Sequence, residues 1–210
     1  MTAPDDWALR AEQQVLDQAL PLIPSRGWTR AMTRAAAKAA GLSAADADLL
    51  LPNGPRDLAA LLSRRHDAAA LAGLPEPGTL KIRERIRAAV IARLDAAEAD
   101  REAVRRWAGF LALPTNLPLA LRLLWESADA LWRWAGDTAT DENHYSKRAI
   151  LSGILIQVTA LDLQLGRAEA LAALDARIQN VMDFEKWKAG FRPSDLAKDF
   201  VGALAKARFG

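Results

Sequence analysis

One predicted helix is apolar around most of its circumference, and this feature constrains the fold more than any other. The helix follows Asn116, which is expected to cap it, and ends near residue 134. Its charges fall on one narrow stripe, in two i,i+4 pairs of opposite sign: Arg122–Glu126 and Asp129–Arg133. Two apolar faces cover the rest, with Leu121, Leu124, Trp125, Ala128 and Trp132 on one and Leu123, Ala130 and Trp134 on the other. Such a helix must lie at the centre of the fold.

The segment from about 142 to 165 is similarly apolar, so the sequence predicts two central helices. Between them lies either a packed core or an apolar pocket. Strong helix formers dominate the whole chain, and no strand-like alternation of apolar and polar residues stands out. Breaker residues divide it into about nine helices. Their approximate ranges are 5–23, 29–41, 43–51, 55–72, 79–107, 116–134, 142–165, 168–188 and 194–208. The fold class is therefore all-α.

Several kinds of chemistry have little support in the composition. The chain lacks cysteine, which excludes disulfides, thiolate metal sites and cysteine nucleophiles, and it has two histidines, His66 and His144. Asp137, Asp141 and His144 form the best candidate metal set, but no Glu-x-x-His pair accompanies them. No phosphate-binding loop, nucleophile elbow or zinc signature occurs. We therefore expect neither catalytic residues nor a metal or other cofactor, although a metal-dependent enzyme stays an alternative.

The N-terminus shows no sign of a secretory leader. It reads MTAPDDWALR, which is acidic and polar where a basic start and an apolar stretch would be needed. The most apolar run, 149–165, contains Gln157, Asp162 and Gln164 and is too short and polar to span a bilayer comfortably. These features predict a cytoplasmic protein that is at most peripherally associated with the inner face of a membrane.

The N-terminal part resembles the DNA-binding end of TetR-type regulators. Its helix order is carried by RGW, AGLS and the short segment SAADADLLLP, within an expected subdomain at 1–75. The third helix, however, offers Asp46 and Asp48 and no Lys or Arg, which phosphates would repel. We interpret it as a helix-turn-helix shape that does not bind nucleic acid. Two alternatives are a chance likeness of small helical bundles and a TetR-like regulator that responds to a lipid.

Residues 104–188 resemble the accessory lipid-binding protein family of ubiquinone (coenzyme Q) biosynthesis. The motifs LWESADALW, AGDTATD, YSKRA and LDARIQNVMDFEK occur in order and at matching spacing. The resemblance implies a TetR-like bundle, a homodimer and a lipid-binding domain at 76–190. It implies that an isoprenoid quinone precursor or a phospholipid occupies an apolar pocket. The expected lipid-binding residues are Leu124, Trp125, Trp132, Trp134, Ile154, Leu155 and Val158.

The resemblance also implies a partner, the di-iron hydroxylase that acts on demethoxyubiquinone. The residues expected to contact it are Asp129, Leu131, Asp141, His144, Tyr145 and Arg148. One departure affects this patch, because the family has an aromatic-rich DFNWY where this chain reads DENHY. Glu142 and His144 thus replace two aromatic residues, and loss of an aromatic anchor weakens docking by ~1–3 kcal/mol. The alternative is a relative that has kept the fold but lost the hydroxylase contact.

The turn at 135–141 is predicted to end one helix at Gly136 and to cap the next with Thr140 or Asp141. Lys147 and Arg148 lie early in that next helix, where the helix dipole disfavours cations. Either they pair with Asp137 or Asp141, or they meet an external partner.

The C-terminal segment 191–210 is predicted to form an amphipathic helix that begins at Pro193 and Ser194. Six Lys or Arg and two Asp follow from position 186 onward, a balance that suits an anionic lipid surface. The alternative is a tail packed on the body or on a dimer mate. The expected membrane-binding residues are Leu196, Phe200, Val201, Leu204, Lys198 and Lys206.

Overall fold

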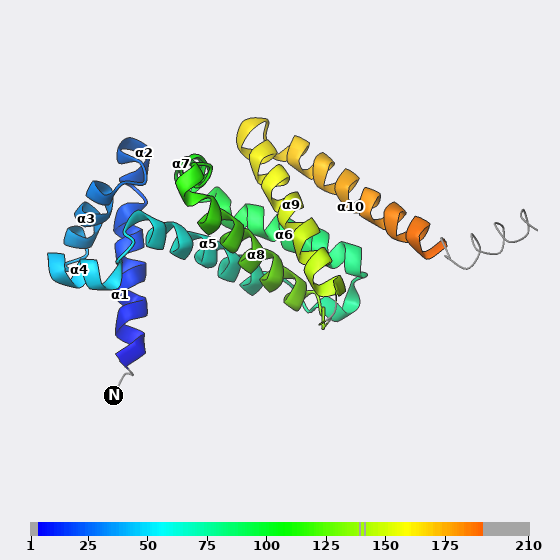
Figure 1. The fold of residues 1–210 in the computed structure, drawn as a ribbon, viewed down its shortest axis with the longest axis horizontal. Coiled ribbons are helices and arrows are strands. Elements are labelled where there is room, and N and C mark those ends of the chain that lie inside the picture. The colour runs from blue at the N-terminus through cyan, green and yellow to red at the C-terminus, as the bar shows by residue number, and fades with distance from the viewer. Residues whose placement is uncertain (1–3, 139, 141, 191–210) are drawn as a thin grey trace, which may run out of the picture.

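The computed structural model describes residues 4–138, 140 and 142–190, and within them it contains ten α-helices, two 3₁₀ turns and no strand. The all-α prediction is confirmed. The helices are α1 Pro4–Ala19, α2 Ile23–Arg26, α3 Arg30–Ala39, α4 Ala44–Leu50, α5 Pro55–Ala72, α6 Ile82–Glu98, α7 Arg101–Leu111, α8 Leu117–Trp134, α9 Glu142–Gln164 and α10 Arg167–Gly190. The 3₁₀ turns are η1 Pro77–Thr79 and η2 Pro114–Asn116. Figure 1 shows two unequal bodies joined by α5.

The smaller body consists of α1 to α4. Its core includes Leu16 and Met32, and Leu58 of α5 closes it. The predicted caps of α3 and α4 are confirmed, because the Thr29 and Ser43 hydroxyls accept hydrogen bonds from the amides of Met32 and Asp46. The TetR-like arrangement of this body stays a prediction.

The predicted first helix, 5–23, is wrong in its second half, because the chain leaves α1 after Ala19. A separate turn of helix, α2, starts at Ile23 and carries Pro24 near its N-terminus, where proline fits. The predicted helix 79–107 is also wrong, because it is two helices that meet at Ala99–Asp100. The Asp100 carboxylate lies 2.8 Å from the His66 ring of α5, and this contact draws the chain out of α6. Helix α7 then runs in a new direction.

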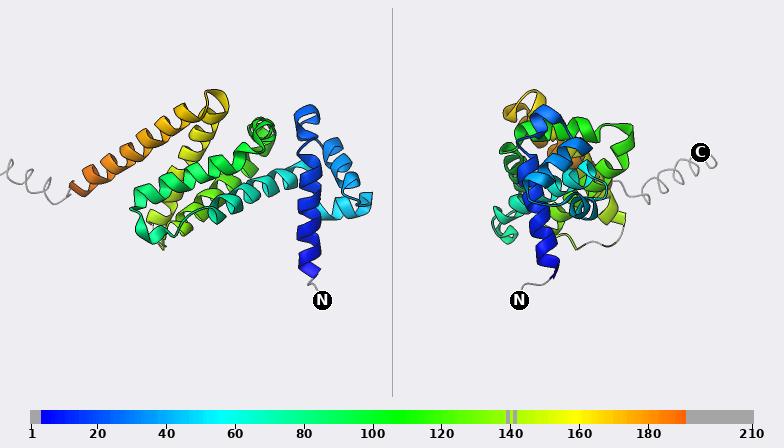
Figure 2. Two further views of the ribbon diagram at one scale, coloured as in Figure 1. Left: turned by 180° about the vertical axis from the view of Figure 1, so that it is seen from behind. Right: turned by 90° about the vertical axis from the view of Figure 1, so that its left-hand side faces the viewer.

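The larger body is built from α6, α8, α9 and α10, with α7 between it and the smaller body (Figure 2). Helix α8 lies at its centre, as its nearly complete apolar surface predicts. Asn116 does not cap α8 through its side chain, so that prediction is wrong. Its amide instead donates to the Phe110 carbonyl and accepts from Arg56.

The end of α8 has the predicted form. Gly136 has a φ of +89°, and the amides of Gly136 and Asp137 donate to the carbonyls of Arg133 and Trp132. This is a Schellman ending, in which a left-handed glycine lets the chain turn sharply. The predicted Thr140 or Asp141 cap and the predicted helix 194–208, with all of the expected membrane-binding residues, lie outside the described residues.

Membrane-spanning helices can be sought only in the described ranges. None of these helices is by itself long and apolar enough to cross a bilayer. The pair Arg101–Leu111 and Pro114–Trp134, bent by 96°, passes that test of length and composition only when taken together.

Candidate functional site

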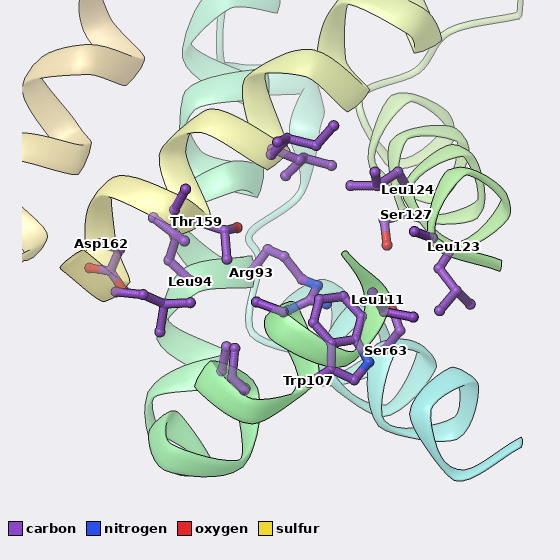
Figure 3. Close-up of a pocket in the computed structure, with 18 of the residues that line it drawn as sticks. Ser63, Arg93, Leu94, Trp107, Leu111, Leu123, Leu124, Ser127, Thr159 and Asp162 are labelled. Carbon is purple, nitrogen blue, oxygen red and sulfur yellow. The ribbon is translucent and has the colours of Figure 1, made fainter. Parts of the chain in front are cut away.

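A cavity of about 370 Å³ lies where α6, α7, α8 and α9 meet, beside α5. Its volume falls at the lower end of the ~300–1,000 Å³ typical of small-molecule sites. Most of its lining is apolar, as Figure 3 shows, and includes Leu94, Trp107, Leu111, Leu123, Leu124 and Leu155. The apolar pocket that the sequence left open between the central helices is therefore present, although α6 and α7 supply much of its wall.

The mouth of the cavity lies between α8 and α9. Three of its lining side chains, Leu117, Leu121 and Ile156, are each at least half exposed to solvent. In contrast, Ser63, Leu123 and Ser127 line the cavity and are almost fully buried. The cavity thus runs from an apolar rim inward to a buried end that carries hydroxyl groups.

Only two of the seven expected lipid-binding residues, Leu124 and Leu155, line the cavity. Ile154 and Val158 lie in the core of the larger body, and Trp132 and Trp134 pack against that core. Trp125 lies near the surface instead, 6.0 Å from Tyr145 between ring centroids. The expectation that these five side chains line the pocket is therefore wrong, because α9 turns them toward α6, α10 or the surface.

Sequence reasoning missed the contribution of α7. Trp107, Leu111 and Val104 line the cavity from this helix. The Trp107 indole donates a hydrogen bond to the Ala59 carbonyl at 2.9 Å, which fixes the ring in the wall. Reading 79–107 as one straight helix pointed these residues in the wrong direction. The break at Asp100 was the signal, because aspartate is favoured at the N-terminus of a helix.

A polar network lies behind the buried end of the cavity. The Asp67 carboxylate accepts a hydrogen bond from Arg93 Nε at 2.5 Å and one from the Ser127 hydroxyl at 2.7 Å. Next to it, His66 is 3% exposed and its Nε2 lies 2.8 Å from Asp100 Oδ2. Burial lowers the pKa of the His66 imidazole below 6.5, and the Arg93 guanidinium lowers it further against the opposing effect of Asp100 and Asp67.

The His66 network predicts a loss of stability in mild acid. Because the folded-state pKa of His66 is depressed, the unfolded chain binds a proton at higher pH than the folded chain does. The stabilising contribution is complete above pH 6.5 and is lost as pH falls below that value. We expect the melting temperature to decrease between pH 7 and pH 5, and to decrease less steeply in His66→Gln. Equal slopes in the two proteins would contradict this assignment, since other groups titrate in both.

A second charged cluster closes the opposite end of the cavity. Arg101 donates to Glu98, to the Asp162 carboxylate and to the Asp162 carbonyl. Arg167 approaches Asp162 at 3.1 Å from the start of α10. These ion pairs join the ends of α6, α7, α9 and α10, so this cluster stabilises the wall.

The turn between α8 and α9 is held by a buried ion cluster. Arg148, which is 1% exposed, donates to Asp129 at 2.6 Å and to Asp137 at 2.9 Å. Lys147 also donates to Asp137, at 2.7 Å, and its Nζ lies 5.4 Å from the centre of the Trp132 ring. Burial by itself would raise the pKa of the Asp137 carboxyl, but the two cations outweigh burial and hold that pKa below its ordinary value of 3.8. The predicted pairing of these cations with Asp137 is confirmed.

The expected partner-binding residues divide between surface and interior. Tyr145 is 63% exposed and packs with Trp125 and His144, at 5.1 Å from the His144 ring. Leu131 and Arg148 are covered by the chain's own helices, so direct contact of these two side chains with a partner is not available in this conformation. Asp129 lies beneath the patch, paired with Arg133 and Arg148. Asp141 lies outside the described residues.

The candidate metal set of Asp137, Asp141 and His144 gains no geometric support. Asp137 is occupied by Lys147 and Arg148. Over the described part of the chain, no group of three or more His, Asp or Glu residues is placed to hold a metal ion.

The apolar cavity and the motif-bearing turn lie in a segment that known families share. The COQ9 family profile matches residues 117–185, which cover α8, α9 and most of α10. The chain is 32% identical over 154 residues to ubiquinone biosynthesis protein COQ9-A, mitochondrial, of Xenopus laevis, covering 68% of this chain and 48% of that protein. It is 30% identical over 151 residues to the protein COQ9, mitochondrial, of Homo sapiens, covering 68% and 48%.

These matches place the chain among relatives of ubiquinone biosynthesis proteins. The family is COQ9, and the resemblance that the sequence motifs indicated is confirmed. The chain spans about half the length of the curated relatives that it matches.

Proposed function

We propose that this chain is a non-catalytic accessory protein of ubiquinone biosynthesis that binds an isoprenoid quinone precursor and presents it to the demethoxyubiquinone hydroxylase at a membrane. The apolar cavity of about 370 Å³, which opens between two helices of the COQ9-like segment, carries this proposal. A polyprenylated ring is nearly insoluble in water, and an apolar cavity with a few buried polar groups suits such a molecule.

Organic extraction of gently purified protein, followed by mass spectrometry, tests the proposed lipid binding. We expect isoprenoid quinones or their precursors to co-purify in a fixed ratio to the protein. A parallel extraction of Thr159→Trp, in which a cavity-lining residue of α9 is enlarged, provides the control. A lipid-free wild-type protein that also has no effect on quinone hydroxylation would contradict the proposal.

The surface of Tyr145, Trp125 and His144 is the proposed contact with the hydroxylase. Tyr145 is the most exposed aromatic of the three, and exposed aromatic side chains dominate interface energetics. The buried Arg148 cluster lies beneath it and holds the start of α9 in place.

Replacement of Tyr145 by alanine is expected to weaken hydroxylase binding by ~1–3 kcal/mol, or roughly 5- to 150-fold in Kd, with little change in stability. Titration calorimetry with the purified hydroxylase measures it. The exposed Leu165, at the far end of α9, offers a matched control as Leu165→Ala. The companion variant His144→Trp restores the aromatic residue typical of the family and should tighten binding. Unchanged affinity in Tyr145→Ala would place the contact elsewhere.

Three further features remain predictions. The segment 191–210 is proposed to bind an anionic membrane surface, and two copies of the chain are proposed to form a homodimer. The animal relatives are mitochondrial by name, whereas this chain is expected to be cytoplasmic and peripheral to the inner face of a membrane. The TetR-like regulator gains no support from α4, where Asp46 and Asp48 are the charged residues.

A further inference from the structure

We propose that the buried end of the cavity is a head-group subsite, in which Arg93 and Ser63 donate hydrogen bonds to uncharged acceptor oxygens of the ligand. This inference rests on the proposed lipid binding and adds the orientation of the ligand and the chemistry of its head. The ring would lie inward, and the isoprenoid tail would leave through the rim formed by Leu117, Leu121 and Ile156.

Arg93 supplies the first observation. Its Nε is committed to Asp67 at 2.5 Å, which fixes the direction of the guanidinium. In the described residues its two Nη groups have no hydrogen-bond partner, although the side chain is only 14% exposed and lines the cavity. Figure 3 shows Arg93 among Trp107, Leu111 and Ser63. By contrast, Arg101 at the other end of the cavity is saturated by Glu98 and Asp162.

Ser63 supplies the second observation. It lines the cavity from α5 and is 2% exposed, yet the described part of the chain provides no hydrogen-bond partner for its hydroxyl. A buried polar group without a partner lowers stability by ~1–3 kcal/mol, so such groups are usually satisfied by a ligand or by water. The subsite therefore offers two kinds of donor at the closed end of an otherwise apolar cavity.

The charge around the subsite selects the class of head group. The positive charge of Arg93 is compensated by Asp67, and Asp100 adds a second carboxylate behind it. Burial keeps His66 from adding a positive charge at neutral pH, since its pKa is lowered. The subsite thus has N–H and O–H donors without net positive charge. It fits the carbonyl and methoxy oxygens of a quinone and disfavours a phosphate or a carboxylate.

Three probes with the same decyl chain test this subsite in calorimetric titrations of the full chain. They are a dimethoxy-methyl-benzoquinone, a benzene ring without oxygen, and a phosphate. We expect the wild-type protein to bind the quinone probe at least ~10-fold more tightly than either of the others, as one or two buried hydrogen bonds predict. Tighter binding of the decyl phosphate would overturn the proposal.

The variant Arg93→Lys keeps the charge that Asp67 requires but removes the two free Nη groups. It should weaken quinone binding by ~5- to 10-fold and leave binding of the decylbenzene probe unchanged. Arg87→Lys is the matched control, because Arg87 lies on the same helix in an exposed pair with Asp175. Ser63→Ala is a milder second variant that should weaken quinone binding by ~3-fold.

The outcomes separate this inference from the proposed function. If the wild-type protein binds the quinone and decylbenzene probes equally and Arg93→Lys changes neither, the head-group subsite is wrong while lipid binding stands. If it binds none of the three probes, both proposals fail. A selective loss of quinone affinity in Arg93→Lys and Ser63→Ala, with Arg87→Lys unchanged, supports the subsite.

Discussion

Replacement of Arg148 by methionine is expected to lower the free energy of unfolding by about 3–5 kcal/mol, because it leaves buried carboxylates without their cation. The guanidinium joins Asp129 on α8 to Asp137 in the following turn, and the side chains of Arg148 and Asp137 are 2% and 4% exposed. Lys147 still reaches Asp137, and Arg133 still reaches Asp129, so the loss should lie toward the lower end of that range. Urea denaturation followed by circular dichroism measures it.

Arg133→Met provides the matched control for this prediction. Arg133 binds the same Asp129 carboxylate at 2.8 Å, but its side chain is 72% exposed, so its loss should change stability by ~0–1 kcal/mol. The acid response gives a second check. The depressed pKa of Asp137 means that its contribution exists above pH 3.8 and disappears as pH falls below that value. The deficit of Arg148→Met should therefore shrink in acid; a deficit that persists there would point to lost packing instead.

Enlargement of Thr159 to tryptophan is expected to reduce lipid binding by at least ~30-fold, because an indole and a ligand cannot share one close-packed cavity. Thr159 lines the cavity from α9, near Leu94 and Arg93 in Figure 3. Filling an empty cavity adds contacts, so the stability of the variant should stay within ~1–3 kcal/mol of the wild type. Titration with the decyl benzoquinone probe gives the affinity.

Gln164→Trp controls for the added aromatic ring, since Gln164 is exposed at the end of the same helix and does not line the cavity. Its lipid affinity should equal that of the wild type. If both tryptophan variants bind lipid normally while remaining folded, the ligand occupies another place and the cavity is not the site.

The parts of the fold that follow from local chemistry could be predicted from the sequence. Ser43 and Thr29 cap their helices, and Gly136 ends α8 in a left-handed conformation, because each effect depends on a few adjacent residues. The pairing of Lys147 and Arg148 with Asp137 was similarly accessible, because the helix dipole made two early cations conspicuous.

The cavity could not be predicted in the same way, because it depends on how helices distant in sequence cross. An apolar surface of α8 or α9 packs equally well on a neighbour or around an empty space, so Ile154 and Val158 lie in the core while Leu155 between them reaches the cavity. The partnership of Asp100 with His66, 34 positions away in sequence, had no local signal, and it determines the direction of α7. Ser63 and Arg93 belong to helices that the sequence placed outside the lipid-binding region.

Helix α10 sets a distance as well as covering α9. It packs on α9 and α6 near its beginning, and Figure 1 shows its later turns diverging from the rest of the larger body. Its 24 residues extend roughly 36 Å at 1.5 Å per residue. A helix of this length acts as a rigid strut. Whatever the chain attaches to beyond Gly190 is therefore held at a defined standoff from the α9–α10 corner, and shortening the strut by whole turns would draw the two together without altering the cavity.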